Sequence, residues 1–260
     1  MKNTIRIISL LLALVLCIGC FASCKTNPDN GNNSVDELPQ SDNYVANVQI
    51  RFATNDEKMK AAVDAMTSNA TINVYGDNFN VYTTSKVNDN TSTNSYTLVD
   101  EILYYSSSLS LGEHTVSENK KAEFTATDKE QVISDLASTA KIDIGDFYVV
   151  DMTKNGNKTS YVCSDAFDEA KAEVASVVAD RFAAIGATVA VSGIEYHLET
   201  ESERNVSSIL SCDYIITLDG VNYEITMRLY TTYNYDATVE VSAPENADSY
   251  VSVPYSEIVK

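Results

Sequence analysis

The chain of 260 residues lacks tryptophan and has only two histidines, His114 and His197. No Gly-x-Ser-x-Gly motif, phosphate loop or dinucleotide fingerprint occurs. Two Ser-x-x-Lys matches, at Ser117 and Ser138, do not lie near the expected start of a helix. Without tryptophan platforms or a barrel pattern, any pairing of carboxylates into a glycosidase site would be arbitrary. We therefore expect no catalytic residues, and an enzyme is the third choice among the functions considered.

Positive charge is also scarce. The chain has 18 Lys and Arg against 37 Asp and Glu, a net charge of -19. Such a surface repels phosphate backbones and anionic lipid headgroups, so we expect no nucleic-acid partner and no direct electrostatic adhesion to a bilayer. Hydrophobic residues make up 44%, with 16 Tyr and 7 Phe, which is enough for a packed core.

The long apolar run of the chain lies at its start. Lys2 and Arg6 provide a basic end, and Ile7 to Leu16 form an uninterrupted apolar stretch. A basic end followed by an apolar stretch of this length is typical of a secretory signal, and the stretch is too short for a permanent membrane span.

The residues after this run resemble a bacterial lipoprotein signal. Phe21-Ala22-Ser23-Cys24 places a small pair before a cysteine, and the polar stretch from Lys25 begins directly afterwards. The resemblance implies that Cys24 carries the lipid and that the protein is anchored to the outer face of the cell membrane. Cys20 is the alternative, although a bulky Ile18 precedes its glycine. An ordinary cleaved signal would leave Cys24 as an unexplained surface thiol.

Three segments follow from these boundaries. We expect a signal peptide at residues 1–23, a lipidated cysteine with a flexible tether at 24–42, and a single domain at 43–260. As a flexible coil the tether would span about 23 Å on average, so the domain can stand away from the membrane.

Three segments within the domain have helical signatures. Capping boxes at Thr54 to Glu57 and Thr127 to Glu130 precede apolar residues at helical spacing. The third segment, 165–185, has acidic residues in its first turn, an apolar stripe, and Gly186 as a stop.

The remaining chain alternates like strands, and three turns predict hairpin registers. The predicted apolar pairs around Asp219-Gly220 are Leu218 with Val221, Ile216 with Tyr223, Tyr214 with Ile225, Cys212 with Met227, and Leu210 with Leu229. Those around Gly76-Asp77 are Val74 with Phe79 and Ile72 with Val81, and those around Asn155-Gly156 are Val150 with Tyr161 and Tyr148 with Cys163. The alternation slips at Gly193, which predicts a β-bulge there.

These elements predict an α+β fold, in which a curved antiparallel sheet has its apolar face covered by about three helices. The Asn-rich tether, the Asp146 to Asp151 hairpin and the ending Val239 to Tyr250 resemble the LolA-like and LppX/LprG-like lipoproteins. The resemblance covers roughly residues 54 to 250. It implies a half-barrel whose concave face, with the helices as a lid, holds an acyl chain or another lipophile.

The candidate ligand-facing positions come from the longest apolar helix stripe and the best-defined sheet face. They are Val178, Phe182, Leu210, Tyr214, Ile216, Tyr223, Ile225 and Met227.

Two further groups of residues suggest a bond or a metal site, but each also has an ordinary structural explanation. Cys163 and Cys212 both fall on apolar hairpin faces. They could form a disulfide bond, or they could be small buried hydrophobic residues. His197 alternates with Glu195 and Glu199, which an ordinary solvent-facing strand also does, so we expect neither a metal nor a cofactor.

Two functions remain in view. The first is a surface lipoprotein that binds a lipid or other lipophilic molecule without catalysis. The alternative is an extracytoplasmic module with a fully packed core and no ligand cavity, whose acidic, tyrosine-rich surface binds a protein or a component of the cell wall. The sequence does not identify a protein partner.

The lipidation assignment leads to a direct prediction. Changing Cys24 to Ala should abolish incorporation of labelled palmitate and release the protein from membranes into the medium, because the acidic domain has no other anchor. The matched variant Cys20→Ala should remain lipidated and attached. The opposite pattern would assign the lipid to Cys20.

Overall fold

The computed structural model describes residues 43–87, 89–126, 147–166, 186–202, 204–237 and 239–259, with single positions inside 127–146 and 167–185. The signal, the tether and both candidate lipidation cysteines, Cys24 and Cys20, lie outside the described residues. So does Val178. These assignments stay predictions.

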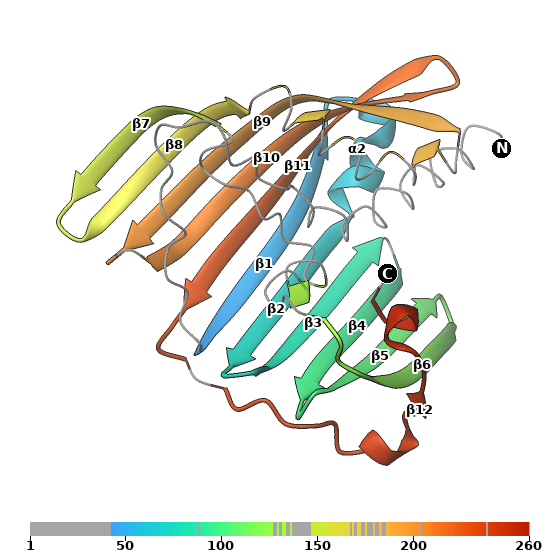
Figure 1. Cartoon of the computed structure of the whole chain (residues 1–260). Helices are drawn as coiled ribbons and strands as arrows, with labels where there is room; N and C mark the ends of the chain where they lie inside the picture. Colours follow the sequence, from blue (N-terminus) through green and yellow to red (C-terminus); the bar gives the residue numbers. More distant parts are fainter. Residues whose placement is uncertain are drawn as a thin grey trace.

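Two meanders of strands make up the described chain (Figure 1). The first contains β1 (Asn43–Thr54), helix α2 (Glu57–Asp64), β2 (Thr67–Tyr75), β3 (Asn78–Val87), β4 (Asn90–Val99), β5 (Ile102–Leu111) and β6 (His114–Glu123). The second contains β7 (Phe147–Asn155), β8 (Lys158–Ala166), β9 (Ala187–Glu201), β10 (Arg204–Leu218) and β11 (Val221–Asn234). The short elements η3 (Ala247–Ser249), β12 (Val251–Ser252) and η4 (Tyr255–Glu257) follow.

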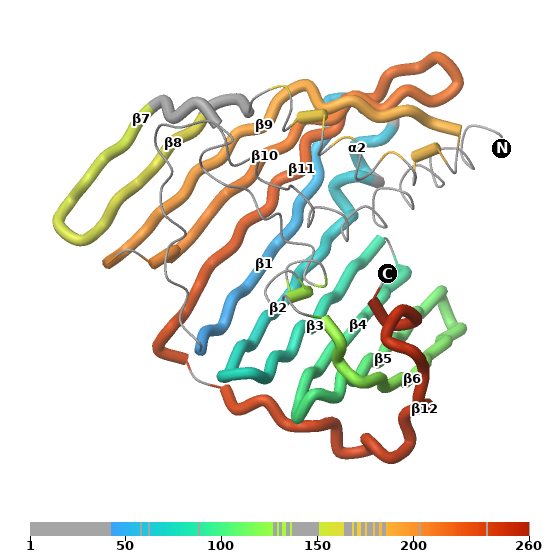
Figure 2. The backbone as a smooth tube through the Cα atoms, in the orientation of Figure 1, coloured from blue at the N-terminus to red at the C-terminus, as the bar shows by residue number. Residues whose placement is uncertain are grey.

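All strands belong to one 12-stranded sheet in the order β12-β6-β5-β4-β3-β2-β1-β11-β10-β9-β8-β7. The two meanders meet where β1 pairs antiparallel with β11, from Val45 opposite Asn234 to Thr54 opposite Ile225. Only β12, among the described strands, pairs in parallel, against β6. Figure 2 shows the resulting course, with the two halves of the chain on either side of the β1 and β11 junction.

The expected fold class, α+β with about three helices covering the sheet, is wrong. Strands dominate the described structure, and within its described ranges α2 is the one α-helix. The helix expected at 127–140 falls on a segment of which only scattered positions are described. The helix expected at 165–185 does not begin where predicted, because Asp165 and Ala166 belong to β8, and of the rest only scattered positions are described. The strands are also long, with 15 residues in each of β9 and β10. A sheet of such strands supplies most of the buried apolar surface by itself.

The start of α2 differs in detail from the predicted capping box. Asp56 occupies the N-cap position, because its carbonyl accepts the first hydrogen bonds of the helix, from the N–H groups of Met59 and Lys60 at 3.0 and 2.9 Å. Thr54 is instead the last residue of β1. Its hydroxyl donates to the carbonyl of Glu224 at 2.6 Å and accepts from the N–H of Asp56 at 3.2 Å. The helix packs against the core with Met59 and Val63 fully buried.

Two predicted registers are confirmed. The pairs around Asp219-Gly220 and Gly76-Asp77 all occur as predicted. Asp219 and Gly220 both have positive φ, 52° and 76°, as the two central residues of a type I′ turn require. The bulge is confirmed too, since Asp213 lies opposite Gly193 and Tyr214 opposite Val191, which leaves Ser192 as the extra residue.

The third register is wrong by one turn position. Asn155 pairs with Lys158, so Gly156 and Asn157 form the turn, and Tyr161 lies opposite Met152 rather than Val150. Gly156, at φ 65°, takes the first turn position, which in a type II′ turn favours glycine. The Asn-Gly dipeptide had suggested a type I′ turn one residue earlier.

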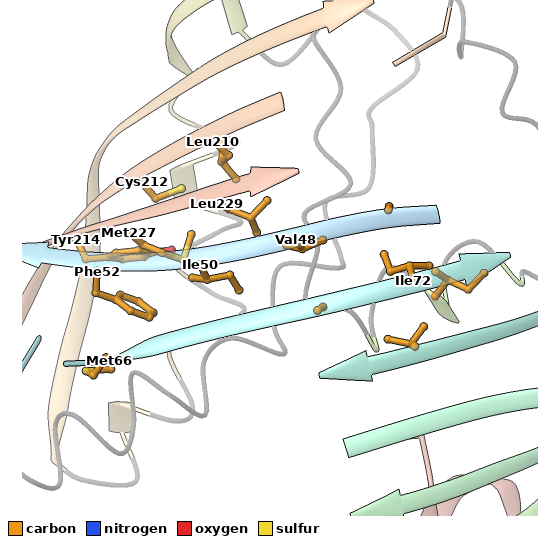
Figure 3. Packing of buried hydrophobic residues seen from close by; sticks show 14 of the residues in the cluster. Val48, Ile50, Phe52, Met66, Ile72, Leu210, Cys212, Tyr214, Met227 and Leu229 are labelled. Carbon is orange, nitrogen blue, oxygen red and sulfur yellow. The ribbon is translucent and has the colours of Figure 1, made fainter. Parts of the chain in front are cut away.

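The hydrophobic core is built mainly from one face of the sheet, which we call the core face, and Figure 3 shows its packing near the junction. After β11 the chain returns along the lower ends of the first meander to the β6 edge (Figure 1). There Tyr250 packs edge-on against Tyr104, and Tyr255 packs edge-on against Phe124. The C-terminal segment thereby wraps around the β6 edge, and Ile258 enters the core. None of the helices in the described part of the chain has the length and apolarity to cross a membrane.

The core face provides a stability prediction. Ile225 is 2% exposed, so Ile225→Asp should place an unpaired charge in the core and lower the free energy of unfolding by about 3 kcal/mol or more. Val221, in the same hairpin, is 50% exposed, and Val221→Asp should change it by about 0.5 kcal/mol or less. Urea unfolding of both variants measures the difference. Equal losses would mean that Ile225 is not a core position.

Candidate functional site

The candidate ligand-facing positions of the sheet lie on the core face of β10 and β11, and Figure 3 shows Leu210, Tyr214 and Met227 among them. Five of them are tightly buried: Leu210 at 2%, Tyr214 at 4%, Ile216 at 0%, Ile225 at 2% and Met227 at 1% exposure. A side chain that lined a cavity wide enough for an acyl chain would keep exposed surface on the cavity side. These five side chains are therefore packed against protein.

The other candidate positions are less uniform. Phe182, one of the single described positions, is 2% exposed and belongs to the same core cluster. Tyr223 is only partly buried, and Val221, expected beside it in the core, is exposed. Both lie near the end of the hairpin, where the sheet has fewer neighbours.

The core face changes character toward the other end of β1 and β11. Tyr44, Tyr233 and Tyr235 cluster there, with ring centroids 6.0 to 6.3 Å apart. The guanidinium of Arg204 lies 5.3 Å from the centre of the Tyr235 ring. Asn205 Oδ1 is buried and finds no hydrogen-bond partner in the part of the chain that the structure describes. Polar and aromatic groups thus border the apolar zone.

Burial controls the ionisation of this tyrosine cluster. Loss of solvation, with smaller contributions from Tyr196, Tyr44 and Tyr235, raises the pKa of Tyr233 far above its ordinary value. Burial also raises the pKa of Tyr235, although the nearby Arg204 acts in the opposite direction. The hydroxyl of Tyr233 therefore stays protonated in the folded protein and can act as a hydrogen-bond donor.

The two cysteines are buried thiols, so the disulfide alternative is wrong for this structure. Cys163 in β8 lies opposite Tyr196, and Cys212 in β10 lies opposite Ile194, so β9 separates the two. Two strand spacings place their Cα atoms about 9 Å or more apart, whereas a disulfide requires about 7 Å or less. Burial raises the pKa of the Cys163 thiol, which makes it a poor nucleophile.

The histidines do not form a site. His197 lies on the exposed face of β9 between Glu195 and Glu199, with Ile209 and Val162 on its flanking strands. His114 begins β6 directly after the turn at Gly112. Within the described residues, no group of three or more His, Cys, Asp or Glu side chains could hold a metal ion.

The outer face of the sheet, opposite the core face, holds a feature that the sequence predictions did not include. Strands β1 to β5 contain no Asp or Glu, although the chain has 37 such residues. Their outward side chains are mainly Thr, Ser and Asn. Cross-strand hydrogen bonds order them, such as Asn80 Nδ2 to Thr97 Oγ1 at 2.8 Å and Thr71 Oγ1 to Asn47 Oδ1 at 3.4 Å.

One row of this outer face carries positive charge, and we call it the cationic track. It runs across eight neighbouring strands from β10 to β6, one residue from each. Its members are Ser211, Arg228, Arg51, Thr67, Lys86, Thr91, Ser110 and Thr115. The sequence alone shows that acidic residues are absent from five segments, which are 43–54, 67–75, 78–87, 90–99 and 102–111. The alignment into one row required the strand registers.

Comparison with known proteins adds little. No family model and no curated protein matches the chain. An isomerase-inactive variant of GphF DH1 aligns with 78% of this chain and 79% of its own, at 8% identity and a TM-score of 0.18. The dehydratase domain of PpsC from Mycobacterium tuberculosis in complex with C12:1-CoA aligns with 77% of this chain and 79% of its own, at 8% identity and a TM-score of 0.13. The dehydratase domain of the CurK module of curacin polyketide synthase aligns with 77% of this chain and 79% of its own, at 9% identity and a TM-score of 0.13.

TM-scores this low do not indicate a shared fold, so these similarities carry no argument about architecture or activity. The resemblance to LolA-like and LppX/LprG-like lipoproteins stays a prediction.

The tyrosine cluster predicts alkaline sensitivity. Folded Tyr233 keeps its proton at a pH where the unfolded chain releases it, so stability is unaffected below about pH 10 and falls as the pH rises further. Tyr233→Phe, which cannot ionise, should flatten this decline in urea unfolding measured at about pH 9 and pH 11. Tyr82→Phe is the control, because that ring is 45% exposed. An unchanged slope in Tyr233→Phe would show that other groups dominate.

Proposed function

We propose that the protein is a lipid-anchored module on the outer face of the cell membrane, which binds a partner through its surface and performs no catalysis. The observation that carries this proposal is the tight burial of the predicted ligand-facing side chains of β10 and β11, at 0 to 4% exposure. The proposal selects the alternative that has a packed core.

Ligand sites for small molecules are usually cavities of about 300 Å³ or more. To open one at Ile216 and Ile225, which are 0% and 2% exposed, close-packed side chains would have to separate and lose their contacts. A surface interaction needs no such change. The ordered outer face of the first meander offers hydroxyl and amide groups that both donate and accept hydrogen bonds.

A sedimentation assay tests the proposal. Cell walls from the host, stripped of membrane by detergent, should carry the purified full chain into the pellet. The Ile225→Asp variant, which should be destabilised by about 3 kcal/mol or more and so populate the folded state less, is the control for a requirement for a folded surface. A wild-type chain that stays in the supernatant with walls and with wall-associated proteins would contradict the proposal.

Lipophile binding is the second candidate function. It is favoured by the placement of the polar tyrosine cluster at the end of the apolar zone, since that order matches a molecule with an apolar chain and a polar head. Native mass spectrometry of the chain purified from its own host would detect a bound lipid. A stoichiometric lipid would reverse the order of the two candidates, and its absence would support the packed-core module.

A further inference from the structure

The cationic track combines three basic side chains with five hydroxyl groups in a straight line. Arg228 and Lys86 are exposed and Arg51 is partly exposed. At about 4.8 Å between neighbouring strands, the track is about 34 Å long. It therefore has the dimensions of a binding site for an extended polymer that crosses the strands.

The basic residues of the track have no acidic partners among the described residues. Arg51 lies directly opposite Arg228 on adjacent strands, an arrangement that is destabilising for like charges. Nη1 of Arg51 donates to the carbonyl of Ile50 at 3.0 Å and to Oδ1 of Asn69 at 3.3 Å. These neutral acceptors position the guanidinium and leave its charge available.

The strands that the track crosses differ in the number of carboxylates they carry. Strands β1 to β5 carry no carboxylate on either face, so Arg51 and Lys86 lie on strands without negative charge. Arg228 shares its outer face with Asp213 of β10 and Glu224 of β11. At one end the track stops at Ser211 in β10, which lies opposite Glu195 of the neighbouring strand β9. Acidic groups thus mark its boundary.

We propose that the cationic track binds an acidic polysaccharide that lies across the strands. Arg51, Arg228 and Lys86 pair with its anionic groups. The hydroxyl groups of the track, from Thr67 between the basic residues and from the residues on either side, exchange hydrogen bonds with those of the sugars. This inference rests on the proposed function, for which it names the surface and the chemistry of the partner.

The side chains around the track favour a polysaccharide over a lipid surface. Thr67, Thr91 and Ser110 supply donors and acceptors that match sugar hydroxyls. Two rows away, Tyr82 is 45% exposed and offers an amphipathic ring on which a sugar can stack. A lipid surface would instead be matched by clustered basic residues with apolar side chains that insert, and the track contains no apolar residue.

Biolayer interferometry with the full chain, immobilised by a C-terminal tag, tests the inference. The probe is polygalacturonate, and its methyl ester is the same polymer without charge. Polygalacturonate should bind at low ionic strength and weaken as salt is added, and the methyl ester should bind much less. Arg51→Gln/Arg228→Gln should raise the dissociation constant about tenfold.

The matched control is Lys154→Gln/Lys158→Gln, which removes two positive charges from β7 and β8, away from the track. It should leave the dissociation constant nearly unchanged. Lys86→Gln provides a second test within the track, with a smaller loss expected. Circular dichroism should show that all variants are folded, because the Arg51 and Arg228 change removes a repulsive pair.

Three results would overturn the inference: equal losses in the two double variants, equal binding of the methyl ester, and stronger binding of phosphatidylglycerol vesicles than of polygalacturonate. Absence of any polygalacturonate binding would also overturn it. If the wild type and Arg51→Gln/Arg228→Gln then both sediment with host cell walls, the proposed function stands and only the track is wrongly assigned. If neither sediments, both fail.

Discussion

The pairing of β1 with β11 is the constraint on which the rest of the structure depends. It joins residues at opposite ends of the domain, with Val45 opposite Asn234, and turns two separate meanders into one sheet. The core face is continuous only because this junction aligns Ile50 with Leu229 and Phe52 with Met227. The outer rows depend on it as well, since it places Arg51 beside Arg228. Weakening this pairing would divide both faces at once.

Local patterns in the sequence predicted much of this fold. Turn dipeptides defined the registers around Asp219 and Gly76, because the type of turn determines which residues face each other. The slip in alternation located the bulge at Gly193, since each extra residue reverses the faces. The turn at Gly156 was misplaced, because glycine suits the first position of one turn type and the second of another. Local sequence does not distinguish these positions.

The non-local features could not be predicted in the same way. The predicted fold class was wrong because helical periodicity in 127–140 and 165–185 was taken to define the cover of the sheet. The length of the strands, which determines the fold class, was underestimated. Most of the apolar sheet positions were identified correctly, with exposed Val221 as an exception. The burial of Ile216 and Met227 depends on what packs over them, which periodicity does not reveal. The cationic track needed eight aligned strands. Its simplest signal, the absence of acidic residues from five strands, was present in the composition of those segments.

The two faces assign different roles to the same strands. Along β11, Met227 and Leu229 pack in the core, and Arg228 between them belongs to the cationic track on the opposite face. Because side chains alternate, surface substitutions at the track should alter binding with little effect on packing. This separation lets the outer face be altered independently of the fold, and it makes a surface function compatible with a tightly packed core.

The C-terminal wrap around β6 has a consequence for the order of assembly. The chain is synthesised from its N-terminus, so the first meander is complete before the second and has two open edges until then. β1 must wait for β11, and β6 must wait for Val251, which pairs with Lys120. Until the last residues are made, both edges present unpaired backbone groups that can associate with other chains. The pairing that protects both edges of the first meander therefore comes last in the assembly of the sheet.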